Sequence, residues 1–269
     1  MSTVKEIIKI MQTIAPEEKA YDKDDFRDRV GLLLGDENEQ VKKVLVALDA
    51  SLDVINEAIA IGAELIITHH PFIFMPLKQI NASDLMGRKI LLCVKNGINI
   101  YSAHTNLDFT KDGINDYLAG LFNLKNIQTL LPYIGENEGW GKVGDITKIK
   151  AADFKKEVAT KLNDNFVALV GDPNATVARI AILNGGCGDD TKYCDWALDA
   201  KADCLITADV KHHVALYAKE TGLILIEPQH YTTEQIYLKK LIELLQSHAK
   251  TKKLNIEILP SKTEKNLKN

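Results

Sequence analysis

The feature that most constrains the fold is a regular alternation of short apolar segments, rich in valine and isoleucine, with segments of helical periodicity. Residues 41–48, 63–68 and 97–103 have the length and composition of buried strands. Helix-patterned segments over 51–62 and around 85–96 lie between them. This strand–helix–strand order predicts an α/β fold with largely parallel or mixed sheets.

The same order of elements returns in the second half of the chain. Strands are expected over 177–183 and 202–207, with a glycine-rich turn and a helix between them. The segment GAELIITHHP matches KADCLITADV, and each half then places a histidine four residues before an acid. Two similar α/β lobes, related by an internal pseudo-repeat, are therefore predicted. The alternative is that α/β units resemble one another through patterning alone.

The expected lobes are intertwined along the chain. The first would cover residues 1–133 and be completed by 227–260, and the second would cover 134–226. Residues 131–147 are rich in glycine, which indicates a connector with turns. Residues 261–269 are polar and rich in lysine, which indicates a flexible tail.

Composition and charge exclude several classes of protein. Of the 269 residues, 46% are hydrophobic and 26% are charged, as in ordinary globular domains. The net charge of -4 gives no basic excess for binding nucleic acid. No apolar run approaches the roughly 20 residues of a membrane span. The four cysteines form no C-x-x-C pair, and the first residues read as an amphipathic helix and not as a signal peptide, so a cytoplasmic protein is expected.

Side chains that can bind metal follow several predicted strands. His69 and His70 come at the end of one strand, His104 follows the next, and His230 follows the last strand of the second half. The carboxyl ends of parallel strands face one crevice, where ligands bind. The presence of several histidines at these strand ends therefore predicts a metal site. The acids at corresponding places are Asp49 and Asp209, with Asp108 and Glu234 a few residues further on.

The adjacent histidines His69 and His70 stand just before Pro71, which disfavours helical geometry at His70. Two neighbouring imidazoles can then point to two positions a few ångströms apart, and paired metal ions lie ~3.5–4 Å apart. His230 and Glu234 share one face if a helix begins at that point. For any one motif alone, a solvent-exposed or hydrogen-bonded histidine is the alternative.

These motifs, in this order, resemble the NIF-three-like family, whose members are often described as GTP cyclohydrolase 1 type 2 homologues. The blocks that carry the resemblance are DRVGLLLGD, ITHHP, SAHTNLDF, DVKHH and HYTTE, and they extend over most of the chain. The resemblance implies two divalent metal ions, of zinc, manganese or iron, in a dinuclear metal site between the two lobes. The ligands that it implies are His69, His70, Asp108, His230 and Glu234, with Asp108 and Glu234 bridging the metals.

The resemblance also implies an assembly and a function. It implies a toroidal homohexamer and a short form of the chain without the inserted middle domain of longer members. His104 would line the site and is the candidate for proton transfer. A dinuclear centre of this kind suits hydrolysis by metal-activated water, with a nucleotide-like small molecule as the candidate substrate. A non-catalytic metal-binding, metal-delivery or regulatory assembly is the alternative function.

Overall fold

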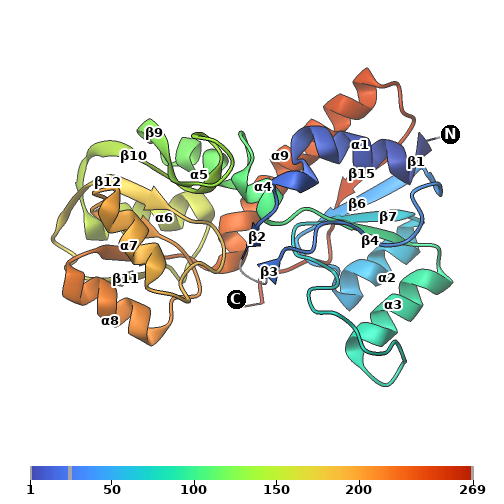
Figure 1. The fold of residues 1–269 in the computed structure, drawn as a ribbon, viewed down its shortest axis with the longest axis horizontal. Helices are drawn as coiled ribbons and strands as arrows, with labels where there is room; N and C mark the ends of the chain where they lie inside the picture. Colours follow the sequence, from blue (N-terminus) through green and yellow to red (C-terminus); the bar gives the residue numbers. More distant parts are fainter. Residues whose placement is uncertain (1, 24–25, 268–269) are drawn as a thin grey trace. The chain divides into compact units, whose positions relative to one another are not determined.

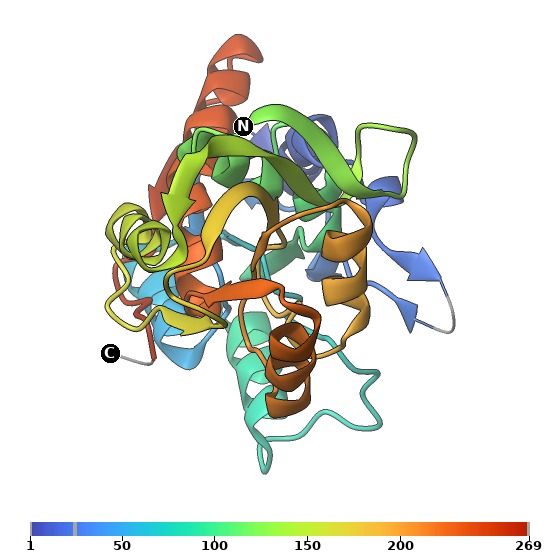
Figure 2. The ribbon, with the colours of Figure 1, turned by 90° about the vertical axis from the view of Figure 1, so that its left-hand side faces the viewer.

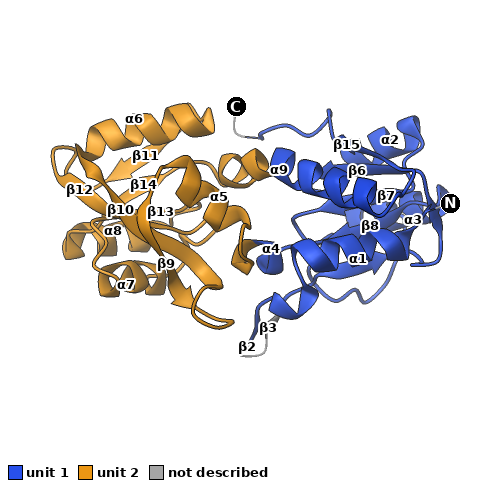
Figure 3. Cartoon of the chain, turned by 90° about the horizontal axis from the view of Figure 1, so that it is seen from above, with its two compact units in different colours: residues 1–107, 238–267 blue, residues 108–237, 268–269 orange. Residues whose placement is uncertain are grey.

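The computed structural model describes residues 2–23 and 26–267 (Figure 1). The chain divides into two compact units, which are coloured separately in Figure 3. Unit 1 consists of Met1–Leu107 and Leu238–Leu267, and unit 2 contains Asp108–Tyr237. The chain therefore leaves unit 1 once and returns to it once.

Unit 1 is built on a five-stranded sheet with the strand order β15-β6-β7-β8-β4. Four strands are parallel, and the edge strand β4 is antiparallel to its neighbour. All four residues of β7 and of β8 are buried, as expected for parallel strands that are covered on both faces. The strands are β4 (Gly31–Leu34), β6 (Lys43–Ala47), β7 (Leu65–Thr68), β8 (Asn99–Ser102) and β15 (Glu257–Pro260).

Helices cover both faces of this sheet (Figure 1). One face packs against α2 (Leu52–Ile61) and α3 (Leu85–Lys95) through a continuous apolar cluster. The other face is covered by α1 (Val4–Ile14) and by the second part of α9 (His230–Thr251). The apolar positions that the sequence pattern assigns to α1 are buried, so its amphipathic helix is confirmed.

Capping groups fix where α2 and α3 begin and end. The Ser51 hydroxyl accepts a hydrogen bond from the Val54 amide, and the Asp84 carboxylate accepts one from the Gly87 amide. Gly62 ends α2 at a φ of 67°, a conformation that glycine adopts without strain. The helix boundaries expected from the sequence are therefore close to those observed.

Shorter elements complete unit 1. Two strands pair near the N-terminus, two others form a small hairpin, and α4 leads into unit 2. These elements are β1 (Ser2–Thr3), β2 (Asp22–Lys23), β3 (Phe26–Arg27), β5 (Gln40–Val41), the 3-10 helix Glu17–Lys19 and α4 (Thr105–Phe109).

Unit 2 contains a six-stranded mixed sheet with the order β11-β14-β13-β12-β10-β9, seen from a second direction in Figure 2. The three strands β12, β13 and β14 are parallel, whereas the other three are antiparallel to their neighbours. The strands are β9 (Lys125–Pro132), β10 (Gly139–Lys150), β11 (Ala168–Val170), β12 (Thr176–Ile182), β13 (Cys204–Ile206) and β14 (Ile224–Glu227).

Helices also cover both faces of the second sheet. An apolar cluster joins α7 (Lys192–Asp199) and α8 (His212–Thr221) to one face, where Leu205 of β13 points. Because side chains alternate along a strand, the neighbours of Leu205 point to the opposite face. That face is covered by α5 (Ile114–Leu121) and α6 (Ala151–Leu162).

The glycine-rich stretch 131–147 is not a connector, so that prediction was wrong. It forms the end of β9, the hairpin turn and the first part of β10, all inside unit 2. Gly139 allows close approach of the two strands, because a Cβ at this position would lie 2.4 Å from the Leu131 oxygen. A Cβ at Gly141 would lie 2.4 Å from the Ile182 oxygen. Glycine inside a strand often marks a site where another backbone approaches closely.

Each unit contains three parallel strands joined by two helices, β6–α2–β7–α3–β8 in unit 1 and β12–α7–β13–α8–β14 in unit 2. The predicted α/β class with parallel and mixed sheets is confirmed. The chain passes from unit 1 to unit 2 after Leu107 and returns to unit 1 after Tyr237. The sequence pattern predicts these boundaries after 133 and 226. The internal pseudo-repeat stays a prediction.

The segment after β15 is held against unit 1 where the sequence predicts a flexible tail. Ser261 donates its amide to the Val46 carbonyl, and Glu57 accepts hydrogen bonds from Ser261, Lys262 and Thr263. The expectation for 261–269 therefore does not hold for its first residues, and 268–269 lie outside the described residues. Such long-range contacts leave no periodic signal in the sequence.

The longest helix, α9, has 22 residues and belongs in part to each unit. Its buried positions include Tyr237, Leu241 and Leu245, whereas Lys239 and Glu243 are exposed. Over residues 2–23 and 26–267, no helix combines the length and the hydropathy that a membrane span requires. A cytoplasmic location stays a prediction.

Candidate metal centre

Three histidines lie together in unit 1 at the carboxyl ends of two strands. His69 and His70 directly follow β7, and His104 follows β8. The ring centroid of His69 lies 5.2 Å from that of His70 and 5.3 Å from that of His104, and the other pair is 6.0 Å apart. His69 is buried and the other two are half-buried. Unit 1 thus gathers three nitrogen donors within one small volume.

The rings of His69 and His70 are held through Nδ1 by oxygen atoms. His69 Nδ1 donates to the Ala103 carbonyl at 2.9 Å, and His70 Nδ1 donates to Asp49 Oδ1 at 3.0 Å. Both oxygens can only accept, so each neutral ring carries its proton on Nδ1 and its lone pair on Nε2. Oxygen partners of this kind orient metal-binding histidines.

His104 is paired with the buried carboxylate of Asp28. His104 Nδ1 donates to Asp28 Oδ1 at 2.9 Å, and Thr105 donates both its amide and its hydroxyl to the other oxygen. Burial raises the pKa of Asp28, but the hydrogen bond and charge of His104, with the bonds from Thr105, lower it below its usual value overall. Asp28 is therefore a stable carboxylate partner for the imidazole.

In unit 2, His230 and Glu234 face each other on the first turns of α9. His230 Nε2 lies 3.1 Å from Glu234 Oε1, as the four-residue spacing predicts. His230 Nδ1 lies 2.7 Å from Asp209 Oδ2, so the ring stands between two carboxylates, with one at each nitrogen. Asp209 has a φ of 56°, a backbone conformation that a short polar residue tolerates.

Asn184 joins the two acids that the family resemblance implies as bridging ligands. Its Nδ2 donates to Asp108 Oδ1 at 2.8 Å and lies 3.4 Å from Glu234 Oε1. The backbone amide of Asn184 donates to Asn115 Oδ1 at 3.1 Å, which fixes the backbone at this point. Glu234 is buried and Asp108 is half-buried. One amide group therefore holds the two carboxylates on the same side of unit 2.

The glycine-rich turn NGGCGDD brings backbone directly against Glu234. Gly185 has a φ of 65°, and a Cβ at this position would lie 2.3 Å from Glu234 Oε1 and 3.3 Å from His230 Nε2. The Gly185 amide donates to the Thr233 hydroxyl at 3.1 Å. Glycine is required here both by its backbone conformation and by the space that the carboxylate occupies.

A buried carboxylate, Asp164, fixes the start of α9. It accepts the amide of Gln229 at 2.7 Å, the side-chain amide of the same residue at 2.9 Å and the Thr232 hydroxyl at 2.7 Å. Burial raises the pKa of Asp164, but the hydrogen bonds, those of Gln229 first, lower it below its usual value overall. Asp164 therefore fixes the point at which α9, the helix that carries His230 and Glu234, begins.

Asp164→Asn is expected to lower the free energy of unfolding by about 2 kcal/mol at neutral pH, because two buried amide donors lose a charged acceptor. A carboxylate with a lowered folded-state pKa stabilises above its unfolded pKa, near 4, and this contribution disappears as pH falls through the folded-state pKa. Urea unfolding at neutral pH and at acid pH should therefore show a difference that shrinks in acid. Asp199→Asn, on an exposed residue of α7, is the control. A difference that is independent of pH would contradict this role.

The predicted site residues thus form two groups, one in each unit. Unit 1 holds His69, His70 and His104, and unit 2 holds Asp108, His230 and Glu234. Among the described residues, His69, His70 and Glu234 each offer a ligand atom of a kind that could hold a metal ion. Asp49 and Asp209 serve as partners of histidines and not as members of these groups. His212 and His213 are exposed at the start of α8.

Three polar residues that support the two groups were not predicted from the sequence. Asp28 lies within the block DRVGLLLGD, but nothing in its spacing indicates His104 as its partner. Asn184 opens the turn NGGCGDD directly after a strand, a position that could have suggested a role at the carboxyl end of the sheet. Asp164 has no local signal, because its partners lie 65 and 68 residues away.

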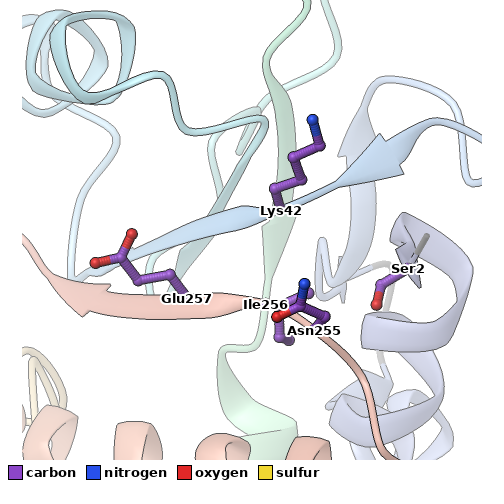
Figure 4. A pocket seen from close by; sticks show the side chains of 5 residues that line it. All are labelled: Ser2, Lys42, Asn255, Ile256 and Glu257. Atoms are coloured by element: carbon purple, nitrogen blue, oxygen red, sulfur yellow. The ribbon is translucent and has the colours of Figure 1, made fainter.

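A pocket of about 280 Å³ in unit 1 is separate from these residues (Figure 4). Polar side chains provide much of its lining, and no predicted site residue contributes to it. Its lining residues are Ser2, Lys42, Asn255, Ile256 and Glu257. The candidate centre is therefore identified by its side chains and not by this pocket.

The chain matches the family described as Duf34/NIF3 (NGG1p interacting factor 3) over residues 2–267. It is 36% identical to the GTP cyclohydrolase 1 type 2 homolog of Clostridium perfringens, over 97% of this chain and 96% of that protein. It is 34% identical to the protein described in the same words from Methanocaldococcus jannaschii, over 95% and 97%. Its fold is similar to that of the Bacillus cereus protein related to NIF3, with a TM-score of 0.90 and 26% identity, over 99% of this chain and 98% of that one.

Proposed function

Because the chain belongs to the Duf34/NIF3 family, we propose that it binds two divalent metal ions and acts as a metal-dependent hydrolase. The reaction would be of the type that the name of the relatives, GTP cyclohydrolase 1 type 2 homolog, suggests, with a nucleotide as the candidate substrate. Zinc, manganese and iron(II) suit its nitrogen and oxygen donors. The proposed ligands are His69, His70, Asp108, His230 and Glu234.

The observation that supports this proposal most is the orientation of the histidines. In both units each of these rings has an oxygen acceptor at Nδ1. In unit 1 this sets the lone pairs of all three imidazoles on Nε2, which packing does not explain, because a structural histidine can use either nitrogen. Metal ligation through Nε2, with an oxygen acceptor behind the ring, uses this arrangement.

When bound, divalent metal ions would supply Lewis acidity and lower the pKa of a water molecule. The chain itself provides the positioning groups. In this proposal Asp108 and Glu234 would supply the carboxylate oxygens that hold the metal ions, and the Asn184 amide keeps the two carboxylates together. His104 is the proton acceptor, since Asp28 holds its Nδ1 proton and directs the lone pair to Nε2.

Elemental analysis of the purified protein is the first test, and two divalent metal ions per chain are expected. The metal-loaded protein should then hydrolyse a member of a panel of nucleotides, phosphoesters and cyclic amides, and a chelator should stop the reaction. His70→Ala should lose metal, whereas His213→Ala, an exposed histidine of α8, should retain it. Protein without metal, and with no affinity for added zinc, manganese or iron(II), would exclude this function.

Bound metal without turnover of any substrate class would favour the alternative, a metal-binding, metal-delivery or regulatory assembly. In that case Glu234→Gln should change the rate at which metal passes to an acceptor chelator. The toroidal homohexamer is a separate proposal that rests on the family resemblance. Measurement of the molar mass in solution tests it independently of the chemistry.

A further inference from the structure

The segment after β15 runs along the strand that leads to the histidine pair of unit 1. Pro260 is in register with Val46 in the parallel pair of β15 and β6, and the Ser261 amide continues this pairing to the Val46 carbonyl at 2.8 Å. The trace that leaves β15 in Figure 3 is this segment. Its path brings Glu264 to the carboxyl end of β6.

At that end, one oxygen of Glu264 binds two successive backbone amides. Glu264 Oε1 accepts the amide of Leu48 at 2.8 Å and the amide of Asp49 at 2.9 Å. Successive amides that point to one atom form an anion-binding concavity. Glu264 occupies this concavity with a carboxylate from the far end of the sequence.

The same two residues hold His70. The Leu48 carbonyl accepts the His70 amide at 2.9 Å, and Asp49 Oδ1 accepts the His70 ring proton at 3.0 Å. Both the backbone and the ring of His70 therefore bond to residues whose amides Glu264 fixes. Only one residue separates Glu264 from the proposed ligand at each of these connections.

We propose that Glu264 is a positioning residue of the metal centre, which sets the orientation of the His70 ring through Leu48 and Asp49. The inference rests on the proposed function, because His70 must be a metal ligand for its orientation to matter. Glu264 need not contact the metal or the substrate.

Anchoring of the tail does not explain Glu264. The segment is already fixed by Glu57, which accepts the Ser261 hydroxyl at 2.6 Å and the Lys262 and Thr263 amides at 2.9 and 3.1 Å. Burial raises the pKa of Glu264 in spite of its two amide partners, and the charge of Asp49 raises it further. Because Asp49 is also an acid, a carboxylate beside it is an unfavourable anchor for the tail. A carboxylate is, however, a strong hydrogen-bond acceptor for two amides.

The test compares variants of Glu264 by cobalt(II) titration, in which the visible absorption spectrum reports the geometry of the ligands. Glu264→Ala is expected to lower the affinity of one cobalt ion about 10- to 100-fold, as loss of outer partners does, and to change its spectrum. Glu264→Gln should preserve both, because its amide oxygen can accept the same two amides. Thr263→Ala removes a neighbouring hydrogen bond to Glu57 and should change neither.

If the wild type binds cobalt and Glu264→Ala shows the same affinity and spectrum, the role of Glu264 alone is overturned. A wild type that binds no metal would overturn the proposed function as well, so the two failures are distinguishable. If Glu264→Ala does not fold, Glu264→Asp serves in its place. Aspartate keeps the charge but is too short for the two amides, and the same loss of affinity and change of spectrum are expected.

Discussion

Removal of divalent metal with a chelator is expected to lower the free energy of unfolding by about 3–4 kcal/mol. A ligand that binds only the folded state stabilises it by RT ln(1 + [L]/Kd), which reaches this size when metal is in large excess over Kd. For a chain of this length, the melting temperature should fall by roughly 10 °C. Calorimetry of the same preparation with and without chelator measures the difference, and restored metal should reverse it.

His69→Ala should remove most of this response to chelator. His69 is 1% exposed and its ring is oriented by the Ala103 carbonyl, so alanine removes a buried, fixed nitrogen donor from the proposed site. The variant is itself less stable, and the informative quantity is therefore the effect of chelator within each variant. His213→Ala should respond as the wild type does. Equal melting of the wild type with and without chelator, in protein shown to contain metal, would contradict the prediction.

The sequence predicted best those parts of the molecule in which a local pattern reports directly on burial. The strand before His69 is a continuous apolar run because parallel strands are covered on both faces. The spacing of His230 and Glu234 predicted that they face each other once α9 begins, and the structure confirms it. Both predictions required only neighbouring residues.

The parts that escaped prediction depend on contacts between distant residues. Leu48 and Glu264 are 216 positions apart, and Gln229 and Asp164 are 65 apart. Nothing in the local sequence of either acid distinguishes it from a surface carboxylate. The prediction for the hairpin of β9 and β10 failed for a related reason, because Gly139 and Gly141 are required by the close approach of neighbouring backbone and not by a connector between units.

Gly185→Ala is expected to weaken metal binding by roughly 10- to 100-fold although glycine offers no side-chain ligand. The new Cβ would lie 2.3 Å from Glu234 Oε1, so the carboxylate must move away. The end of a glutamate moves at little cost, and the φ of 65° adds a penalty of about 1–2 kcal/mol for alanine. Folding should therefore survive while the proposed ligand atom is displaced.

The neighbouring glycine supplies a matched control for this experiment. A Cβ at Gly186 would lie 3.4 Å from Asp209 Oδ2 and 3.5 Å from His230 Nδ1, which are ordinary contacts, and its φ is not in the left-handed region. Gly186→Ala should therefore bind metal nearly as the wild type does. Unfolding in the presence of chelator gives the stability of each variant without metal, and a metal titration gives its affinity. If Gly185→Ala loses stability but keeps full affinity, Glu234 Oε1 is not a metal ligand, and the carboxylate of Asp108 must serve without it.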